Sequence, residues 1–300
     1  MSAVGIVALG LFSSFVILKN GIIRQVPQDS LAVYRRAIER DPLDIGCMNA
    51  PTPCLIGAPS VAPSVFIWGD SHASATLPGF DDWLRTVGAS ALTFTKSACP
   101  PLLDVWRVDV GPNHNCDGHN ADALATITET PTIDTVILFA RWSLATEGTR
   151  AKRESGNPAI LALSGETSTD VSGNAELVYL GLNRAVEALL FREINVIIIR
   201  GTPEIGTNVP NMVLGQDNES QNTVLPTRTD VDQRNERADQ IIAEVAERRD
   251  VLVLSPRDFL CAETCLIQIE GAPLYRDDDH LSAFGARWLI PNLMHNVDLR

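Results

Sequence analysis

Basic side chains are scarce in this sequence. Among its 300 residues, 24 are Lys or Arg and 37 are Asp or Glu, which gives a formal net charge of −13. A nucleic-acid binder needs a basic face that neutralises phosphates, so this balance argues against a nucleic-acid partner. It also argues against docking on an anionic lipid surface, because like charges repel each other. A membrane anchor remains compatible with it.

Nucleotide-binding motifs are also missing. The chain has neither a Gly-x-Gly-x-x-Gly fingerprint nor a phosphate-binding loop, which disfavours a nucleotide cofactor. Hydrophobic residues make up 45% and charged residues 20% of the chain. These values are close to the globular average and exclude disorder for the bulk of the sequence.

Six cysteines are present, an even number at short separations. The simplest of the possible connectivities joins each to its neighbour, as Cys47–Cys54, Cys99–Cys116 and Cys261–Cys265. Structural disulfides indicate an oxidising compartment such as the periplasm or the exterior. Two alternatives stay open: six free thiols in a cytosolic enzyme, or a zinc site at His114, Cys116 and His119, whose spacing fits no standard zinc signature.

The first 18 residues carry no charge, and Lys19 ends the run. This length is at the short end for a membrane-spanning helix. A signal peptide would need a positively charged start, which is absent, and a buried helix is the third alternative. We expect a transmembrane helix over residues 1–20. Lys19 and Arg24 would keep the remainder in the cytosol by the positive-inside rule, in conflict with disulfides, unless other helices of a larger bundle set the topology.

Apolar runs and amphipathic stretches alternate through the rest of the chain. Residues 21–62 are proline-rich and predict a linker with one short helix. We expect strands over 64–69, 89–95, 134–140, 195–200 and 250–255, and helices over 73–87, 116–130, 175–191, 230–249 and 283–292. Uniformly apolar strands are typical of parallel sheets that are buried on both faces. The pattern predicts an α/β fold with a doubly wound sheet, interrupted by long polar loops at 146–174 and 201–229.

The first candidate for chemistry is Gly69-Asp70-Ser71-His72, which follows the first of these strands and precedes a helix. Ligand sites in open α/β sheets lie at the carboxyl ends of strands. A serine at a helix N-terminus also lies among free backbone N–H groups that can stabilise an oxyanion. The alternative is a simple helix cap formed by Asp70 or Ser71.

The second candidate is the segment Asp277-Asp278-Asp279-His280, just before the last helix. A serine nucleophile needs a base, and the base needs a carboxylate that orients it. Asp277 lies three residues before His280, so both side chains can meet on one turn. Alternatives are an acidic loop with a capping histidine, or a calcium site, although the alternating ligand pattern of calcium loops is missing.

Together, the early Gly-Asp-Ser-His and late Asp-x-x-His motifs resemble the SGNH hydrolase superfamily. More narrowly, the chain resembles the extracytoplasmic SGNH domain that follows the membrane bundle in bacterial acyltransferase-3 (OafA-type) O-acetylases. The narrower resemblance rests on residues 68–73 (WGDSHA), 97–101 (SACPP), 138–142 (LFARW), the pair Cys261 and Cys265, and residues 274–282 (LYRDDDHLS). It covers about Pro59 to Asn292.

The resemblance implies a three-layer SGNH/flavodoxin-like sandwich over residues 63–300, with a five-stranded, mainly parallel sheet preceded by one transmembrane helix. It implies that Ser71 is the nucleophile, that His280 is general base and then acid, and that Asp277 orients His280. The backbone N–H of Ser71 would be one oxyanion donor. No metal and no bound organic cofactor is implied.

The sequence departs from the superfamily pattern at the expected oxyanion residues. Where Gly-x-Asn is expected after the third strand, the chain has Ala140-Arg141-Trp142. The remaining candidates for oxyanion contacts are the backbone of Ser97–Cys99 and the side chain of Arg141, with a structural ion pair as the alternative for Arg141. Trp142 could stack on a sugar ring or pack in the core.

The implied function is extracytoplasmic acetyl transfer to hydroxyls of a cell-envelope polysaccharide through an acyl-serine. The alternatives are a carbohydrate O-acetyl esterase and a binding module with a degraded site. The implied partners are a glycan acceptor and a membrane acyltransferase bundle, and the implied location is the bacterial inner membrane, single-pass, with the domain in the periplasm. Such relatives carry many helices before the domain, so one apolar helix fits a truncated reading frame, a misplaced start or a stand-alone form.

Overall fold

A six-stranded sheet forms the centre of the computed structural model, which describes residues 28–215, 224–247 and 251–299. Its strand order is β1-β3-β2-β5-β7-β8. The strands span Cys54–Gly57 (β1), Val65–Gly69 (β2), Ser90–Thr95 (β3), Thr135–Phe139 (β5), Asn195–Ile199 (β7) and Leu252–Leu254 (β8). Five of them are parallel, and β1 runs antiparallel to β3 at one edge. The predicted α/β fold with a mainly parallel sheet is confirmed, with one more strand than the five expected.

The additional strand comes from the segment that was expected to be a linker. Residues 21–62 contribute β1 and the short helix α3 (Pro42–Cys47) to the domain, besides α2 (Gln28–Ile38). The pairing of β1 with β3 and the disulfide between Cys47 and Cys54 attach this segment to the sheet. The folded domain therefore begins well before residue 63.

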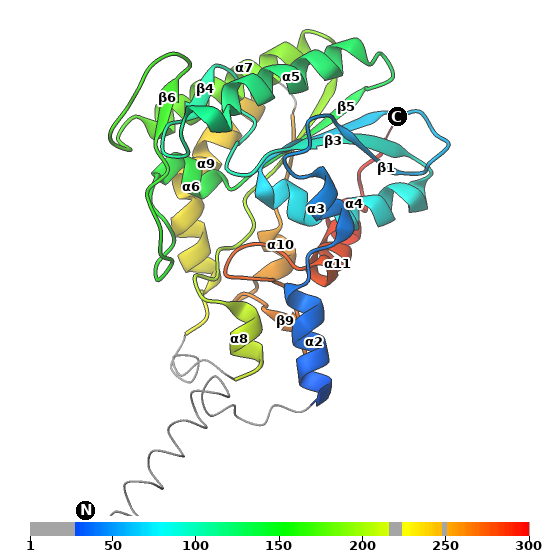
Figure 1. Ribbon diagram of the computed structural model, residues 1–300, viewed down its shortest axis with the longest axis vertical. Helices are drawn as coiled ribbons and strands as arrows, with labels where there is room; N and C mark the ends of the chain where they lie inside the picture. The colour runs from blue at the N-terminus through cyan, green and yellow to red at the C-terminus, as the bar shows by residue number, and fades with distance from the viewer. Residues whose placement is uncertain (1–27, 216–223, 248–250, 300) are drawn as a thin grey trace, which may run out of the picture.

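Helices cover both faces of the sheet (Figure 1). On one face lie α5 (Cys116–Glu129), α7 (Asn174–Leu190) and α9 (Arg228–Glu247); on the other lie α3, α4 (Ser71–Val87) and α11 (Ala283–Leu293). Alternate residues of β2 point to opposite faces, as in any strand: Phe66 and Trp68 join the first core, and Val65 and Ile67 the second. The result is the predicted three-layer sandwich.

Smaller elements surround the carboxyl edge of the sheet. They are β4 (Val105–Arg107), η1 (Pro112–His114), α6 (Trp142–Glu147), β6 (Leu161–Leu163), α8 (Val209–Val213), α10 (Arg257–Leu260), β9 (Gln268–Ile269) and β10 (Ala272–Pro273). The two long polar segments contain some of these: β6 pairs with β4, and α8 lies in the second segment. A third apolar cluster, which includes Leu274, Tyr275 and Leu281, supports the loop that precedes α11.

All six cysteines are paired, each with its neighbour in the sequence. The Cys99–Cys116 bond joins the loop after β3 to the start of α5, and Cys261–Cys265 closes a turn after α10. A zinc site that uses Cys116 is therefore ruled out, because its sulfur is already bonded.

The transmembrane helix predicted over residues 1–20 lies outside the described residues. Among the helices that the structure does describe, none combines the length and the hydropathy needed to cross a bilayer.

Candidate active site

Ser71 stands at the carboxyl edge of the sheet, where β2 turns into α4. The turn requires glycine at position 69, because a Cβ there would lie 1.9 Å from the backbone oxygen of Phe139 on β5. Asp70 follows as the N-cap residue, and its Oδ1 accepts a hydrogen bond from the N–H of His72 at 2.8 Å. The strand therefore stops abruptly and the helix starts with Ser71 in its first turn.

Asp70 also connects the ends of β2 and β5. Its buried carboxylate accepts a second hydrogen bond, from the backbone N–H of Arg141 at 2.9 Å. This contact holds the turn after β5 beside the turn that carries Ser71. It also occupies the N–H of Arg141, which is therefore not a free donor for an oxyanion.

The structure brings the three residues predicted for catalysis into one chain of contacts. His280 Nε2 lies 2.9 Å from Ser71 Oγ, and His280 Nδ1 lies 2.9 Å from Asp277 Oδ2. The other oxygen of Asp277 accepts the backbone N–H groups of Asp279 at 3.0 Å and His280 at 2.7 Å. With a carboxylate at Nδ1, the proton of a neutral imidazole resides there, and Nε2 is left to accept the proton of the serine hydroxyl.

A second carboxylate, to which the sequence analysis gave no role, reaches the same imidazole. Asp279 Oδ1 lies 2.7 Å from His280 Nδ1. The Asp279 side chain is 4% exposed, whereas that of Asp277 is 36% exposed. The run of three acids was visible in the sequence, but which of them turns inward depends on the surroundings of each side chain.

The two carboxylates determine the protonation of the base. Burial by itself would lower the pKa of His280, but the charges of Asp279 and Asp277 outweigh burial and raise that pKa to about 10. Burial likewise acts to raise the pKa values of both aspartates, and the adjacent His280 lowers them instead. The two carboxylates therefore strongly stabilise the protonated, imidazolium form of His280.

Arg141 holds Asp279 in place from the opposite side. Its buried guanidinium forms ion pairs with Asp279, Glu154 and Glu204. Glu204 is also bound by Arg234 at 2.6 Å. Because the Arg141 side chain is fully engaged, it is not available to an oxyanion or a substrate, and of the two roles considered for it the structure shows the ion pair.

Two further candidates from the sequence also have other partners. Trp142 is completely buried, and its indole N–H donates to the backbone oxygen of Ile199 at 2.8 Å, so it cannot stack on a sugar. Ser97 donates both its backbone N–H and its hydroxyl to Oδ1 of Asn49, at 3.0 and 3.1 Å. The donors of both residues are thus already hydrogen-bonded within the protein. Their positions beside the sheet edge in the sequence did not reveal these partners.

Asn49 itself lies at this edge and was not singled out by the sequence. Its backbone N–H donates to the oxygen of Thr95 at 2.9 Å, at the end of β3. It adopts the left-handed region with a φ of 61°, a conformation that is uncommon outside glycine and that Asn tolerates best. Because its side-chain oxygen is fixed by Ser97, its amide nitrogen is the group left to donate.

His72 lies directly behind the catalytic base. Its ring centroid is 4.6 Å from that of His280, and its Nε2 is 3.7 Å from Asp279 Oδ2. The side chain is buried, and within the described part of the chain neither ring nitrogen has a hydrogen-bond partner. His72 therefore packs against His280 and also lies within ion-pair distance of Asp279, whose pKa it helps to lower.

Two groups of acids are close enough together to be considered as metal ligands. One contains Asp277, Asp278 and Asp279, and the other Glu154, Glu204 and Asp279. His280 is the counter-ion within the first group and Arg141 within the second. Burial and the charge of Asp279 also raise the pKa of Asp278 to about 6, which weakens it as a ligand. A metal ion would have to displace these cations.

A serine, a histidine and an aspartate arranged in this way at the edge of a parallel α/β sheet define the class of enzymes that act through an acyl-serine. The model of the SGNH domain that is fused to AT3 domains matches residues 38–294. The chain belongs to this family, whose enzymes transfer acyl groups or hydrolyse esters. The match also begins before residue 63, in agreement with the position of β1.

Several solved structures are similar to this chain at low sequence identity. The periplasmic domain of the lipopolysaccharide acetyltransferase of Salmonella ser. Paratyphi A superposes with a TM-score of 0.59 at 15% identity, over 90% of this chain and 97% of that one. A carbohydrate acetylesterase family member from Sinorhizobium meliloti gives 0.46 at 11% identity over 78% and 96%. An acetyl xylan esterase gives 0.44 at 16% identity over 78% and 99%. A search of curated protein sequences finds no match.

Proposed function

We propose that this domain transfers an acetyl group to hydroxyls of a cell-envelope polysaccharide, with Ser71 as the nucleophile. The observation that carries the proposal is the chain of contacts from Ser71 Oγ through His280 to Asp277, with both distances at 2.9 Å. The shared fold with a lipopolysaccharide acetyltransferase domain supports the choice of acceptor class.

The reaction has two steps. In the first, His280 Nε2 takes the proton of Ser71 while Oγ attacks the acyl carbonyl carbon. The bond to the leaving oxygen then breaks, and His280 returns the proton to that oxygen, which leaves an ester on Ser71. In the second, a glycan hydroxyl gives its proton to His280 and attacks the ester carbonyl carbon. The bond between that carbon and Ser71 Oγ then breaks, and His280 returns the proton to Oγ.

Two donors serve the oxyanion in this proposal. One is the backbone N–H of Ser71 in the first turn of α4, where the N–H groups have no partner within the helix. The other is the side-chain amide of Asn49, which replaces the Asn that the superfamily places after the strand corresponding to β5. Its fixed oxygen and its position at the end of β3 support this assignment.

Location and partners belong to the same proposal. Three disulfides favour an oxidising, extracytoplasmic compartment, and the family is one of domains fused to membrane AT3 domains. We infer that the domain works at the outer side of a bacterial inner membrane, anchored there. A membrane acyltransferase bundle would supply the acyl group.

The alternative function is a carbohydrate O-acetyl esterase. The imidazole of His280 is 20% exposed, so water can reach the same position as a sugar hydroxyl. Both reactions share the acyl-serine and differ only in the group that accepts the acetyl.

The test uses the full-length chain with its disulfides intact and 4-nitrophenyl acetate as the donor. We expect nitrophenol release that requires Ser71 and His280, and acetylated sugar in the mass spectrum when an oligosaccharide is added. Release that gives only acetate with every acceptor would favour the esterase. Full activity in both Ser71→Ala and His280→Ala would refute the assigned residues, and failure of the wild type to acylate Ser71 would favour a binding module.

A further inference from the structure

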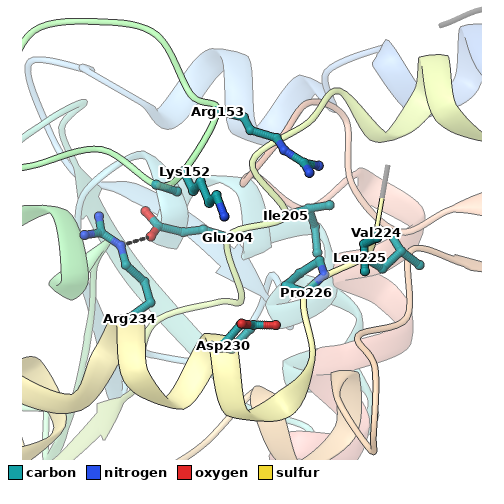
Figure 2. Close-up of a pocket in the computed structure, with 11 residues that line it drawn as sticks. Lys152, Arg153, Glu204, Ile205, Val224, Leu225, Pro226, Asp230 and Arg234 are labelled. Carbon is teal, nitrogen blue, oxygen red and sulfur yellow. Dashed lines mark hydrogen bonds and ion pairs between the residues drawn. The ribbon is translucent and has the colours of Figure 1, made fainter. Parts of the chain in front are cut away.

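A cavity of about 360 Å³ lies next to the catalytic loop (Figure 2). This volume is within the range of small-molecule sites, roughly 300–1,000 Å³. Its apolar walls come from Ile205, Leu225, Pro226 and Val231. Its charged groups come from the loop at residues 151–153, from Glu204 after β7 and from the first turns of α9. An apolar wall with a few charged groups suits a sugar ring that carries a charge.

One wall of the cavity is hydrogen-bonded to the loop that carries His280. The backbone N–H of Ile205 donates to the oxygen of Asp278 at 2.8 Å, and that of Gly206 donates to the same oxygen at 3.2 Å. Asp278 lies between the two aspartates that contact His280. The segment that lines the cavity is therefore bonded directly to the loop that holds the catalytic base.

The charges of the lining favour an anion. Lys152, Arg153 and Arg234 face Glu204 and Asp230 around the cavity. Glu204 and Arg234 pair with each other, as the dashed line in Figure 2 shows. Asp230 accepts hydrogen bonds from Thr227 at 2.8 and 2.6 Å, and these, with a smaller contribution from Lys152, lower its pKa.

Lys152 and Arg153 are left without such partners. Among the described residues neither side chain forms an ion pair, although three nearby arginines are each bound by a carboxylate: Arg141, Arg150 and Arg234. The cavity lining thus carries a net charge of +1, three cations against two acids, on a chain of −13. Figure 2 shows Lys152 and Arg153 on one side of the cavity and Asp230 on the opposite side.

The fold itself presents these two cations. The next residue, Glu154, turns inward to Arg141, the same arginine that binds Asp279. Arg153 is held in the left-handed region with a φ of 77°, which bulky residues adopt rarely. Gly206 packs below the loop, since a Cβ there would lie 2.5 Å from the backbone oxygen of Lys152. The loop is therefore fixed by the buried ion network, with its two cations at the cavity.

We propose that this cavity is an acceptor subsite that binds an acidic sugar unit, with Lys152 and Arg153 as ligands of its anionic group. The proposal rests on the proposed function and adds the chemical class of the acceptor: a glycan that carries a carboxylate or a phosphate close to the hydroxyl that is acetylated. The apolar wall at Ile205, Leu225 and Pro226 would contact the carbon face of the same ring.

Binding is tested first, in a chain that cannot turn over. Full-length Ser71→Ala is titrated calorimetrically with trigalacturonate, with a galactose trisaccharide that bears one phosphate, and with neutral galactotriose. We expect the neutral sugar to bind more weakly than at least one anionic sugar, and the preference to fade as salt increases. Binding of the carboxylate sugar, the phosphate sugar or both supports the proposal and identifies the source of the charge. Equal binding of all three sugars, or none, overturns it.

Variants of the two cations test whether the preference for an anionic acceptor arises at this cavity. In the double variant Lys152→Gln/Arg153→Gln, KM for the preferred anionic acceptor should rise roughly tenfold for each cation removed, because hydrogen bonds to charged groups are lost. KM for the neutral acceptor should not change. The matched control is Arg184→Gln/Arg192→Gln on and beside α7, which removes the same charge away from the cavity. An equal rise of KM in the control would overturn the proposal.

Measuring nitrophenol release and sugar binding separately distinguishes failure of the subsite from failure of the proposed function. The initial burst of nitrophenol release without an acceptor reports the acylation of Ser71 and should be the same in wild type and in both double variants. If the wild type fails to acylate, the proposed function fails, while the titrations still decide whether the cavity binds acidic sugars. If acylation is normal and the cavity variants bind the preferred anionic sugar as the parent does, the subsite fails and the function stands.

Discussion

The turns after β2 and β5 are neighbours at the same edge of the sheet, yet their side chains lie in different environments. The turn after β2 leaves the hydroxyl of Ser71 free to meet His280. The turn after β5 buries Arg141 among three carboxylates and Trp142 in the core. Position at the carboxyl edge therefore does not make a residue catalytic. In the proposed mechanism, one turn supplies the reacting group, and the other holds Asp279, which contacts the base.

The largest effect is expected from variants of Ser71, on the turn after β2, and of His280, which Ser71 contacts. Ser71→Ala removes the nucleophile, and His280→Ala removes the base; each should lower kcat by about 10⁴-fold or more, as removal of such residues does in other serine enzymes. Steady-state release of nitrophenol measures the loss. The double variant should be no worse than either single one, because the two residues act as a unit. Losses that multiply in the double variant would contradict that.

A change in the turn after β5 should affect the stability of the folded protein. Arg141→Met leaves Asp279, Glu154 and Glu204 buried without their shared cation, which we expect to cost about 3–5 kcal/mol of the free energy of unfolding. Denaturant unfolding measures the change. The control is Arg85→Met, which removes an exposed ion pair with Asp81 and should change stability little. Equal effects in both variants would show that the buried network has no structural role.

Asn49 is the proposed oxyanion donor in place of the one that the turn after β5 does not supply. Asn49→Ala should lower kcat by about 10²–10³-fold, the usual cost of one oxyanion donor, with a smaller effect on KM. Because loss of the Ser97 contact could disturb the loop, Ser97→Ala is the matched control: it removes the hydroxyl contact but keeps the backbone one. If Asn49→Ala and Ser97→Ala reduce kcat equally, Asn49 positions the loop and is not an oxyanion donor.

The smallest expected effect is a shift of the pH profile, which shows how Asp279, one of the two carboxylates that contact His280, affects the pKa of its imidazole. The groups that face the imidazole of His280 are Asp277, Asp279, Ser71 and His72. Asp279→Asn removes a negative charge that raises the pKa of His280, so the imidazole loses its proton at lower pH. Since the reaction needs unprotonated His280, the acid limb of kcat/KM should move down by about one pH unit or more.

The matched control for that shift is Asp278→Asn. The backbone oxygen of Asp278 is bonded to Ile205 and Gly206, and its carboxyl is not among the groups at the imidazole. This variant should leave the acid limb near its original position. A profile that moves upward in Asp279→Asn, or that does not move, would contradict the role given to Asp279.

The alternation of buried strands and amphipathic helices was enough to predict an α/β fold with a doubly wound sheet, because apolar periodicity reports burial directly. It did not predict β1, since residues 54–57 form a short edge strand that depends on β3 and on a disulfide for its place. Prolines before it look like a linker in the sequence. The other edge strand, β8, was expected because its apolar run follows a long amphipathic helix, whereas β1 follows a proline-rich segment.

For the site, the sequence by itself determined the contact between Asp277 and His280, because three residues on one tight turn bring a carboxylate to an imidazole regardless of the surroundings. It also determined where Ser71 lies, because a serine between a buried strand and a helix is placed at the sheet edge. Only the tertiary structure decided the partners of Arg141, Ser97 and Asn49, and the inward turn of Asp279. Those contacts join segments far apart in the chain, and a buried charge takes its role from whichever opposite charge the fold places beside it.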